Sequence, residues 1–172
     1  MACDDESVDL GLAEQSLLVT GGSSGIGFET ARLLLAEGAL VTICGRNPDR
    51  LAAAELELGS SNLHVISADV RSASEAEAAV SAAVEHGGAL DGVAAVAGRG
   101  RRGSLLEMDP ADVDREVSDK LLSLLNIVKP AVPHLVSAAG RVVALTAPTA
   151  SRPDPNMAAI SIGRAALDSA VG

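Results

Sequence analysis

The sequence contains no tyrosine and no tryptophan, and Phe28 is its single phenylalanine. General acid catalysis by a phenol is therefore excluded, because only a tyrosine side chain carries that group. The two cysteines, Cys3 and Cys44, have no metal-ligand spacing and suggest no disulfide. No uninterrupted apolar run is long enough to cross a bilayer. We expect neither a metal site nor a membrane span.

Cations are also scarce, since 13 Lys and Arg stand against 23 Asp and Glu and give a net charge of −10. Nucleic acids and anionic membranes bind cationic surfaces, so neither is an expected partner. Residues 1–14 are acidic and have neither the basic start nor the apolar stretch of a secretory signal. We expect a flexible acidic tail over 1–14 and a cytoplasmic protein.

What the sequence does contain is aliphatic: 48% of the 172 residues are hydrophobic, enough for one domain over 15–172. Apolar segments of strand length alternate with longer stretches of helical period. The pattern predicts an α/β fold with a Rossmann-like, doubly wound parallel sheet. About five strands are readable, at 16–20, 40–44, 64–67, 93–97 and 141–146.

The helices between these strands have recognisable starts and stops. Capping residues precede three of them, at Asn47, Ser72 and Asp109. Ser72 and Glu75 have the spacing of a capping box. Pro130 and Pro133 are expected to bend or end the long helix that begins after Asp109, because proline removes a helical N–H. A last helix is expected from about Met157.

A glycine-rich turn, Thr20 to Gly27, joins the first strand to the first helix. Glycine lets the backbone turn tightly and approach a pyrophosphate, which meets free N–H groups at the helix start. The spacing Thr-Gly-x-x-x-Gly-x-Gly resembles that of the short-chain dehydrogenase/reductase family, and the resemblance extends from about Ser16 to Asp168. It implies that the dinucleotide contacts Gly21, Ser23, Ser24, Gly25, Ile26 and Gly27.

Further matches concern the two ends of the dinucleotide. Arg46, at the end of the second strand, resembles family members that prefer NADP, where an arginine meets the 2′-phosphate. The resemblance also implies that Asp69 and Val70 lie beside the adenine, and Ala97 and Gly98 beside the nicotinamide ribose. The asparagines that precede this Ala-Gly pair in the family are absent. A solvated Arg46 and a simple turn role for Asp69 remain alternatives.

The family's catalytic set is replaced at every position. In the family a Ser and a Tyr hold the substrate carbonyl, a Lys lowers the Tyr pKa, and an Asn supports a water. Alignment puts Ala147, Ile160, Arg164 and Lys120, respectively, at these positions. No residue is therefore assigned as catalytic.

Other groups remain as alternatives for the missing acid. Lys120 is one, and the hydroxyls of Thr146, Thr149 and Ser161 are others. Against this, we expect Lys120 to be a solvated or ion-paired helix residue beside Asp119. Arg164 is expected to contact the ribose or a phosphate of the cofactor rather than to take part in catalysis.

Two more features stand outside the motif set. Arg99, Arg101 and Arg102 form a glycine-rich loop that either binds an anionic group or is simply solvated. The family's C-terminal substrate lobe is expected to be missing, which leaves the strand at 141–146 as an open edge. By resemblance, the helices near 113–135 and 157–171 pair in a homo- or hetero-oligomer.

Together these observations predict a short-chain dehydrogenase/reductase-like protein that binds NADP(H) without the standard ketoreductase or dehydrogenase activity. One alternative is an NADP-dependent oxidoreductase or a non-redox enzyme with a substitute acid. In this alternative the protein also binds a small-molecule ligand. The other alternative is a structural partner of an active relative.

Overall fold

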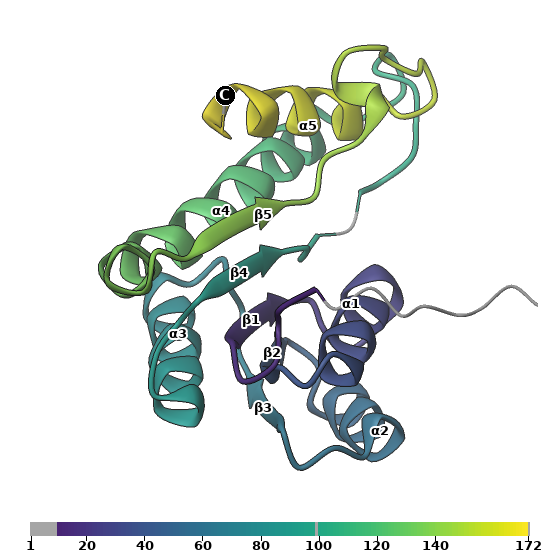
Figure 1. Ribbon diagram of the computed structural model, residues 1–172. Helices are drawn as coiled ribbons and strands as arrows, with labels where there is room; N and C mark the ends of the chain where they lie inside the picture. Colours follow the sequence, from purple (N-terminus) through teal and green to yellow (C-terminus); the bar gives the residue numbers. More distant parts are fainter. Residues whose placement is uncertain (1–9, 99, 172) are drawn as a thin grey trace, which may run out of the picture.

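A single parallel sheet organises the computed structural model, which describes residues 10–98 and 100–171 (Figure 1). Its five strands follow the order β3-β2-β1-β4-β5, and every pairing between neighbours is parallel. The strands are β1 (Ser16–Thr20), β2 (Leu40–Gly45), β3 (Leu63–Ser67), β4 (Gly92–Ala95) and β5 (Arg141–Ala144). The order reverses direction between β1 and β4, as in a doubly wound fold. The predicted Rossmann-like fold class is confirmed.

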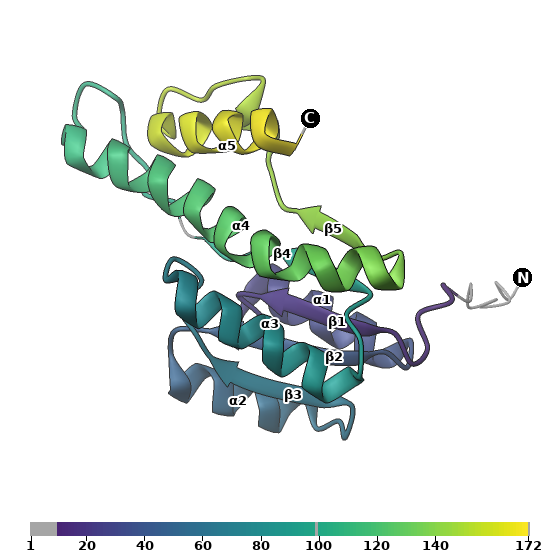
Figure 2. The same cartoon turned by 90° about the vertical axis from the view of Figure 1, so that its left-hand side faces the viewer.

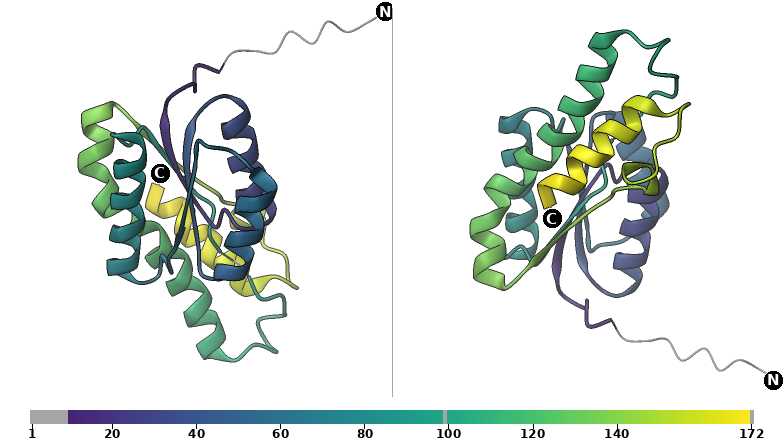
Figure 3. Two further views of the ribbon diagram at one scale, coloured as in Figure 1. Left: turned by 90° about the horizontal axis from the view of Figure 1, so that it is seen from below. Right: turned by 90° about the horizontal axis from the view of Figure 1, so that it is seen from above.

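Helices cover both faces of this sheet, and the views from below and above show the layers edge on (Figure 3). The helices are α1 (Gly25–Ala36), α2 (Pro48–Leu58), α3 (Ala73–Gly87), α4 (Pro110–Ala138) and α5 (Ala158–Val171), with a 3-10 turn η1 at Pro148–Ala150. Helices α1 and α2 lie on one face and α3 and α4 on the other. Helix α5 packs along α4, above the sheet in Figure 2.

Two apolar clusters fill the spaces between the sheet and its helices. Successive residues of β1 point to opposite faces, so Leu18 enters one cluster and Val19 the other. The Leu18 cluster includes Val80 of α3 and Ile127 of α4, whereas the Val19 cluster includes Ala31 of α1. Both β1 residues are fully buried. The central strand thus joins the two halves of the core.

Two of the three predicted helix caps are confirmed. Asn47 and Asp109 each accept a hydrogen bond from a backbone N–H in the first helical turn, at 2.9 and 2.8 Å. The capping box at Ser72 is wrong, because Ser72 precedes α3 but makes no side-chain cap bond. The carboxylate of Glu75 instead accepts from the backbone N–H of Asp69 at 2.9 Å. Its side chain therefore fixes the loop before the helix.

Pro130 and Pro133 were expected to bend or end the long helix, and they do not end it. Helix α4 continues through Pro130 and Pro133 to Ala138. Ala131 and Leu135 lie beside these prolines and are buried in the core. Their packing offsets the helical hydrogen bonds that the two prolines cannot donate.

Helix α4 is also long and apolar enough to cross a membrane by length and composition alone. A helix of this kind was not expected, since no uninterrupted apolar run of that length occurs in the sequence. This is a weak indication, since a helix from the core of a soluble protein passes the same test, and α4 packs against α3 and α5. The expectation that the protein has no membrane partner stays a prediction.

Strand β5 forms one edge of the sheet, as predicted. It pairs with β4 alone in the part of the chain that the structure describes. Val142 and Val143 are 37% and 68% exposed, in contrast to the buried valines of β1 and β2. The sheet therefore ends in a short apolar strand with a free backbone edge.

Candidate functional site

The glycine turn between β1 and α1 has the geometry that a phosphate cradle needs. The backbone N–H groups of Gly21 and Gly22 both donate to the Cys44 carbonyl, at 2.8 and 3.2 Å, which ties the turn to β2. Gly21 has a φ of 72°, a value that favours glycine. A Cβ on Gly27 would lie 2.4 Å from the Gly21 carbonyl oxygen. Only glycine fits at this position without a shift of the backbone.

The start of α1 offers unoccupied hydrogen-bond donors. Ser24 is the N-cap residue, yet its side chain makes no capping bond to the first turn. Gly25, with a φ of 58°, would place a Cβ in open space, so this side of the turn is not filled by protein. Free N–H groups and the positive end of the helix dipole favour an anion. The residues present therefore fit the pyrophosphate of a dinucleotide.

Burial prevents the side chain of the neighbouring Cys44 from taking a chemical role. Its thiol is fully buried, and burial raises its pKa to about 12. A thiol with such a pKa does not supply the thiolate that a nucleophile or metal ligand needs. Its backbone carbonyl is the group that contributes to the turn.

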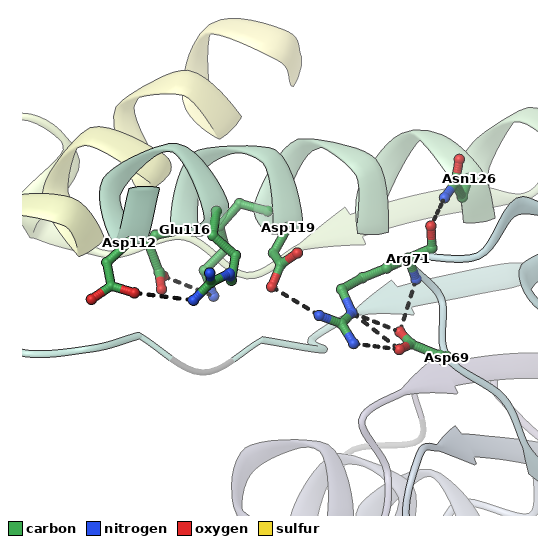
Figure 4. A network of polar contacts seen from close by, with 8 residues as sticks. Asp69, Arg71, Asp112, Glu116, Asp119 and Asn126 are labelled. Atoms are coloured by element: carbon green, nitrogen blue, oxygen red, sulfur yellow. Dashed lines mark hydrogen bonds and ion pairs between the residues drawn. The ribbon is translucent and has the colours of Figure 1, made fainter. Parts of the chain in front are cut away.

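The loop predicted to lie beside the adenine, at Asp69 and Val70, is held by ion pairs (Figure 4). The Arg71 guanidinium pairs with Asp69 at 2.6 Å and with Asp119 of α4 at 3.2 Å. Its side-chain hydrogen bond is the main cause that lowers the pKa of Asp69. The Asn126 amide donates to the Arg71 carbonyl at 2.8 Å. The loop after β3 is thus attached to α4, and Arg46 on the loop after β2 is exposed.

Thr20 fixes the other side of the turn. Its buried hydroxyl oxygen accepts hydrogen bonds from the backbone N–H groups of Val96 and Ala97, at 3.1 and 3.0 Å. A Cβ on Gly21 would lie 3.0 Å from the Cα of Ala97. The segment after β4 therefore lies directly against the glycine turn, and the structure brings these two predicted cofactor elements together.

Lys120 does not occupy the place expected from the sequence. It is only 6% exposed, and its nearest carboxylate is Glu116, with 4.0 Å between Lys120 Nζ and Glu116 Oε1. Its neighbour Asp119 is engaged by Arg71. The expectation of a solvated lysine is wrong, whereas an ion pair is present, with Glu116 as the partner. The helical rotation that sends Asp119 toward the β3 loop sends Lys120 toward α5.

Lys120 and Arg164 form one cationic group between α4 and α5. A Cβ on Gly98 would lie 2.1 Å from Lys120 Nζ, so the ammonium lies against the Gly98 backbone. The Arg164 guanidinium donates to the Leu145 carbonyl after β5. Burial lowers the pKa of Lys120, and the charge of Arg164 lowers it further. Both cations lie at the carboxyl end of the sheet.

Glu116 is a functional candidate that the sequence did not single out. Its side chain is 9% exposed, and Oε1 has no hydrogen-bond partner among the described residues. Burial raises its pKa, while the charge of Lys120 and a backbone hydrogen bond from Arg101 oppose this shift. The i,i+4 spacing to Lys120 was the available signal. It was not distinctive, because most such pairs on helices are exposed.

Ile160 lies beside this charged group, whereas Ala147 directly precedes η1. A Cβ on Gly100 would lie 2.2 Å from Ile160 Cγ1 and 3.2 Å from Glu116 Oε1, so both side chains lie under the loop that follows β4. Among the alternative hydroxyls, Ser161 is already used, since it donates to the Met157 carbonyl at 2.9 Å. The buried hydroxyl of Thr149 has no hydrogen-bond partner within the described chain. Thr146 is exposed.

A small hollow of about 10 Å³ lies where these elements meet. Its lining includes Thr20, Ala97, Lys120, Leu145 and Arg164. The hollow thus joins the end of β1, the segment after β4, and both long helices. Three of the predicted site residues, Ala97, Lys120 and Arg164, share it.

The arginine loop is only partly described. Arg99 lies outside the described residues, and Arg102 is exposed. Arg101 forms an ion pair with Asp112 of α4, which also pairs with Arg115 at 3.0 Å. At least one of the three arginines is therefore engaged within the protein. Across residues 10–98 and 100–171, no cluster of three metal-ligating side chains is present.

Comparison with known proteins gives this geometry a context. The family model described as short chain dehydrogenase matches residues 15–170. The chain is 38% identical over 127 residues to the ipsdienol dehydrogenase of Ips pini. The aligned region covers 70% of this chain and 48% of that protein. The chain therefore spans about half the length of this relative.

Solved structures agree in fold. A short-chain oxidoreductase of Pseudomonas aeruginosa PAO1, solved with NADPH bound and described as containing an atypical catalytic center, is 33% identical with a TM-score of 0.88. The match covers 92% of this chain and 64% of that one. A short chain dehydrogenase/reductase of Burkholderia phymatum in complex with NAD, 19% identical with a TM-score of 0.87, covers 92% and 58% and shares the fold alone.

Proposed function

Because the chain belongs to the short-chain dehydrogenase/reductase family, we propose that it binds NADP(H) and lacks the tyrosine-dependent reductase chemistry of that family. The observation that carries the proposal is a contrast within one site. The cradle at Gly21 to Gly27 keeps its geometry, whereas the family's four catalytic positions hold Lys120, Ala147, Ile160 and Arg164.

Several contacts support the binding half of the proposal. The pyrophosphate would lie at the N-terminus of α1, held by the turn, with Ser23, Ser24 and Ile26 along its edge. Ala97 and Gly98 would lie beside the nicotinamide ribose, and Val70 and Asp69 beside the adenine. A nicotinamide dinucleotide supplies hydride chemistry when bound. The Pseudomonas relative at 33% identity was solved with NADPH.

The preference for NADP over NAD rests on Arg46. It is exposed at the end of β2, where a phosphate can reach it, and a guanidinium binds phosphate through paired N–H donors. Titration with NADPH and with NADH, followed by the fluorescence of the reduced ring, tests this proposal. Absence of binding for both ligands at millimolar concentration would overturn the proposed dinucleotide binding.

The missing phenol supports the second half. Ile160 has no proton to transfer, and the guanidinium of Arg164 holds its proton too tightly to act as an acid at neutral pH. Stopped assays for NADPH oxidation with 4-nitrobenzaldehyde and with 9,10-phenanthrenequinone test it directly. We expect no carbonyl-dependent oxidation above the rate without protein, and a clear rate would refute the proposed inactivity.

A second candidate is an oxidoreductase or a non-redox enzyme with Lys120 as substitute acid, acting on a small molecule. The observation that favours it is the position of the buried ammonium, which lines the hollow between β1 and α5. Protonated amines stabilise developing negative charge on oxygen. If either carbonyl probe oxidises NADPH, Lys120→Met should abolish that rate, and an unchanged rate would eliminate this candidate.

Self-association through α4 and α5 is also part of the proposal, either with a second copy or with an active relative. Both helices expose apolar side chains, among them Leu122, Leu125, Val132 and Ile162. Sedimentation velocity of the wild type and of Leu125→Glu tests it, and a monomer at all concentrations would refute it. Members of the family are generally soluble, and a cytoplasmic location is proposed with the function.

A further inference from the structure

We propose that the Lys120 and Arg164 cations make this site selective for the reduced form of the dinucleotide, NADPH, over the oxidised form, NADP⁺. The inference rests on the proposed NADP(H) binding and specifies which redox form is bound. It concerns charge: the nicotinamide ring is neutral in NADPH and carries a positive charge in NADP⁺.

The first step places the nicotinamide half of the ligand. The glycine turn follows β1, the strand at which the sheet order reverses, and dinucleotides cross a sheet at such a point. The proposed adenosine contacts, Arg46 and Asp69, follow β2 and β3. The other half therefore extends toward β4 and β5, where the hollow lined by Lys120 and Arg164 lies.

The second step concerns the charges at that end. Lys120 is nine-tenths buried, and the Arg164 guanidinium contacts the Leu145 carbonyl within the same hollow. Two cations that line one hollow repel a third positive charge, and water screens buried charges less than exposed ones. NADP⁺ brings such a charge and NADPH does not. The two ligands differ little elsewhere, so this end of the site decides between them.

The third step concerns the nearby carboxylates, whose negative charge opposes that of the two cations. Glu116 Oε1 lies 4.0 Å from Lys120 Nζ, and the charge of Lys120 opposes the rise that burial causes in the Glu116 pKa. Asp119 is neutralised by Arg71, and Asp168 acts on Arg164 from the exposed side of α5. Glu116 is thus the one buried counter-charge that we find for Lys120 in the described chain, and its loss should strengthen the selectivity.

The experiment compares dissociation constants for NADPH, NADP⁺ and 2′,5′-ADP by isothermal titration calorimetry at low salt. We expect the wild type to bind NADPH about tenfold more tightly than NADP⁺ or better. Lys120→Met should bring the two constants close together. The affinity for 2′,5′-ADP, which has no nicotinamide, should be unchanged in that variant.

The matched control is Lys129→Met, since Lys129 lies exposed on the same helix. It should leave the ratio of the two constants at its wild-type value. Glu116→Gln should widen the ratio, because it removes the negative charge beside Lys120. This variant also keeps the shape of the side chain, so it remains informative if Lys120→Met does not fold.

The outcomes separate the two proposals. Equal affinity of the wild type for NADPH and NADP⁺ overturns the selectivity and leaves the proposed function intact. A matching change in Lys120→Met and Lys129→Met, or an equal loss of 2′,5′-ADP binding in Lys120→Met, also overturns it. Binding of none of the three ligands overturns the proposed function and this inference with it.

Discussion

The two halves of the sheet differ in how much of the family's pattern they keep. The half formed by β1, β2 and β3 has two buried strands, β1 and β2, and the glycine turn, with an ion pair at Asp69. The half formed by β4 and β5 ends in an exposed edge strand, and it holds the positions at which we propose that the family's asparagines and catalytic side chains are replaced. The proposed divergence is concentrated at one end of the site.

This difference separates two requirements that usually occur together. Dinucleotide binding depends mainly on backbone shape, which the glycines of the first half provide. Reduction depends on particular side chains, which α4 and α5 normally carry in the second half. A chain can therefore lose the second requirement while the first remains. Substitutions that act on one half test how independent the halves are.

The largest expected effect is on stability in the first half. Leu18→Ala removes a fully buried side chain from the centre of the sheet and should lower the free energy of unfolding by about 3 kcal/mol. Its counterpart Val143→Ala, on β5, should change it by less than about 0.5 kcal/mol because that side chain is 68% exposed. Urea denaturation measures both. Equal losses would mean that β5 is covered in solution.

A backbone clash in the turn comes next. Gly27→Ala would place a Cβ 2.4 Å from the Gly21 carbonyl oxygen, so the cradle must deform. We expect the NADPH affinity to fall about 100-fold, equivalent to about 2.7 kcal/mol. Gly88→Ala is the control, since its φ of 73° costs some stability at the end of α3, far from the turn. Unchanged NADPH binding in Gly27→Ala would contradict the proposed cradle.

A smaller effect is expected from Arg46→Ala. Loss of a charge-assisted contact to the 2′-phosphate should weaken NADPH binding about tenfold and leave NADH binding unchanged. Arg50→Ala, an exposed arginine on α2, is the matched control. Fluorescence titration of all three proteins with both ligands gives the answer. A similar loss for NADH would show that Arg46 does not select the phosphate.

The smallest effect concerns the link between the halves. Asp119→Asn removes one ion pair of Arg71, and exposed pairs of this kind contribute about 0.5 kcal/mol. Arg71 also holds the pKa of Asp69 below its usual 3.8. The stability that the Asp69–Arg71 ion pair contributes is fully present above pH 3.8. It is lost as the pH falls through the lowered pKa of Asp69. Thermal melts between pH 2.5 and 7 should show an acid-side loss that Arg71→Ala reduces.

Most of the fold could be predicted because it depends on local pattern. Alternating apolar segments gave all five strands to within two residues at each end, and Asn47 and Asp109 gave two helix starts. The prolines of α4 and the Ser72 capping box were misjudged. Contacts outside the local helical pattern decided both outcomes: core packing beside Pro133, and the hydrogen bond that the Asp69 backbone N–H donates to the Glu75 carboxylate.

The site could be predicted only in part. The glycine turn and the segment at Ala97 meet as expected, because parallel strands bring their carboxyl ends to one edge. Glu116 was missed, and the surroundings of Lys120 were wrongly expected. The direction of a side chain on a long helix depends on which neighbours that helix packs against, and α5 lies about 40 residues further along the chain.

By itself, the sequence determined that residues 1–172 contain no tyrosine and that a glycine turn follows the first strand, because composition and backbone freedom are local properties. Only the tertiary structure decided that Lys120 is buried with Arg164 and Glu116 while Asp119 pairs with Arg71. The reason is that burial and charge pairing depend on the rotation of α4 against α3 and α5. No local pattern specifies that rotation.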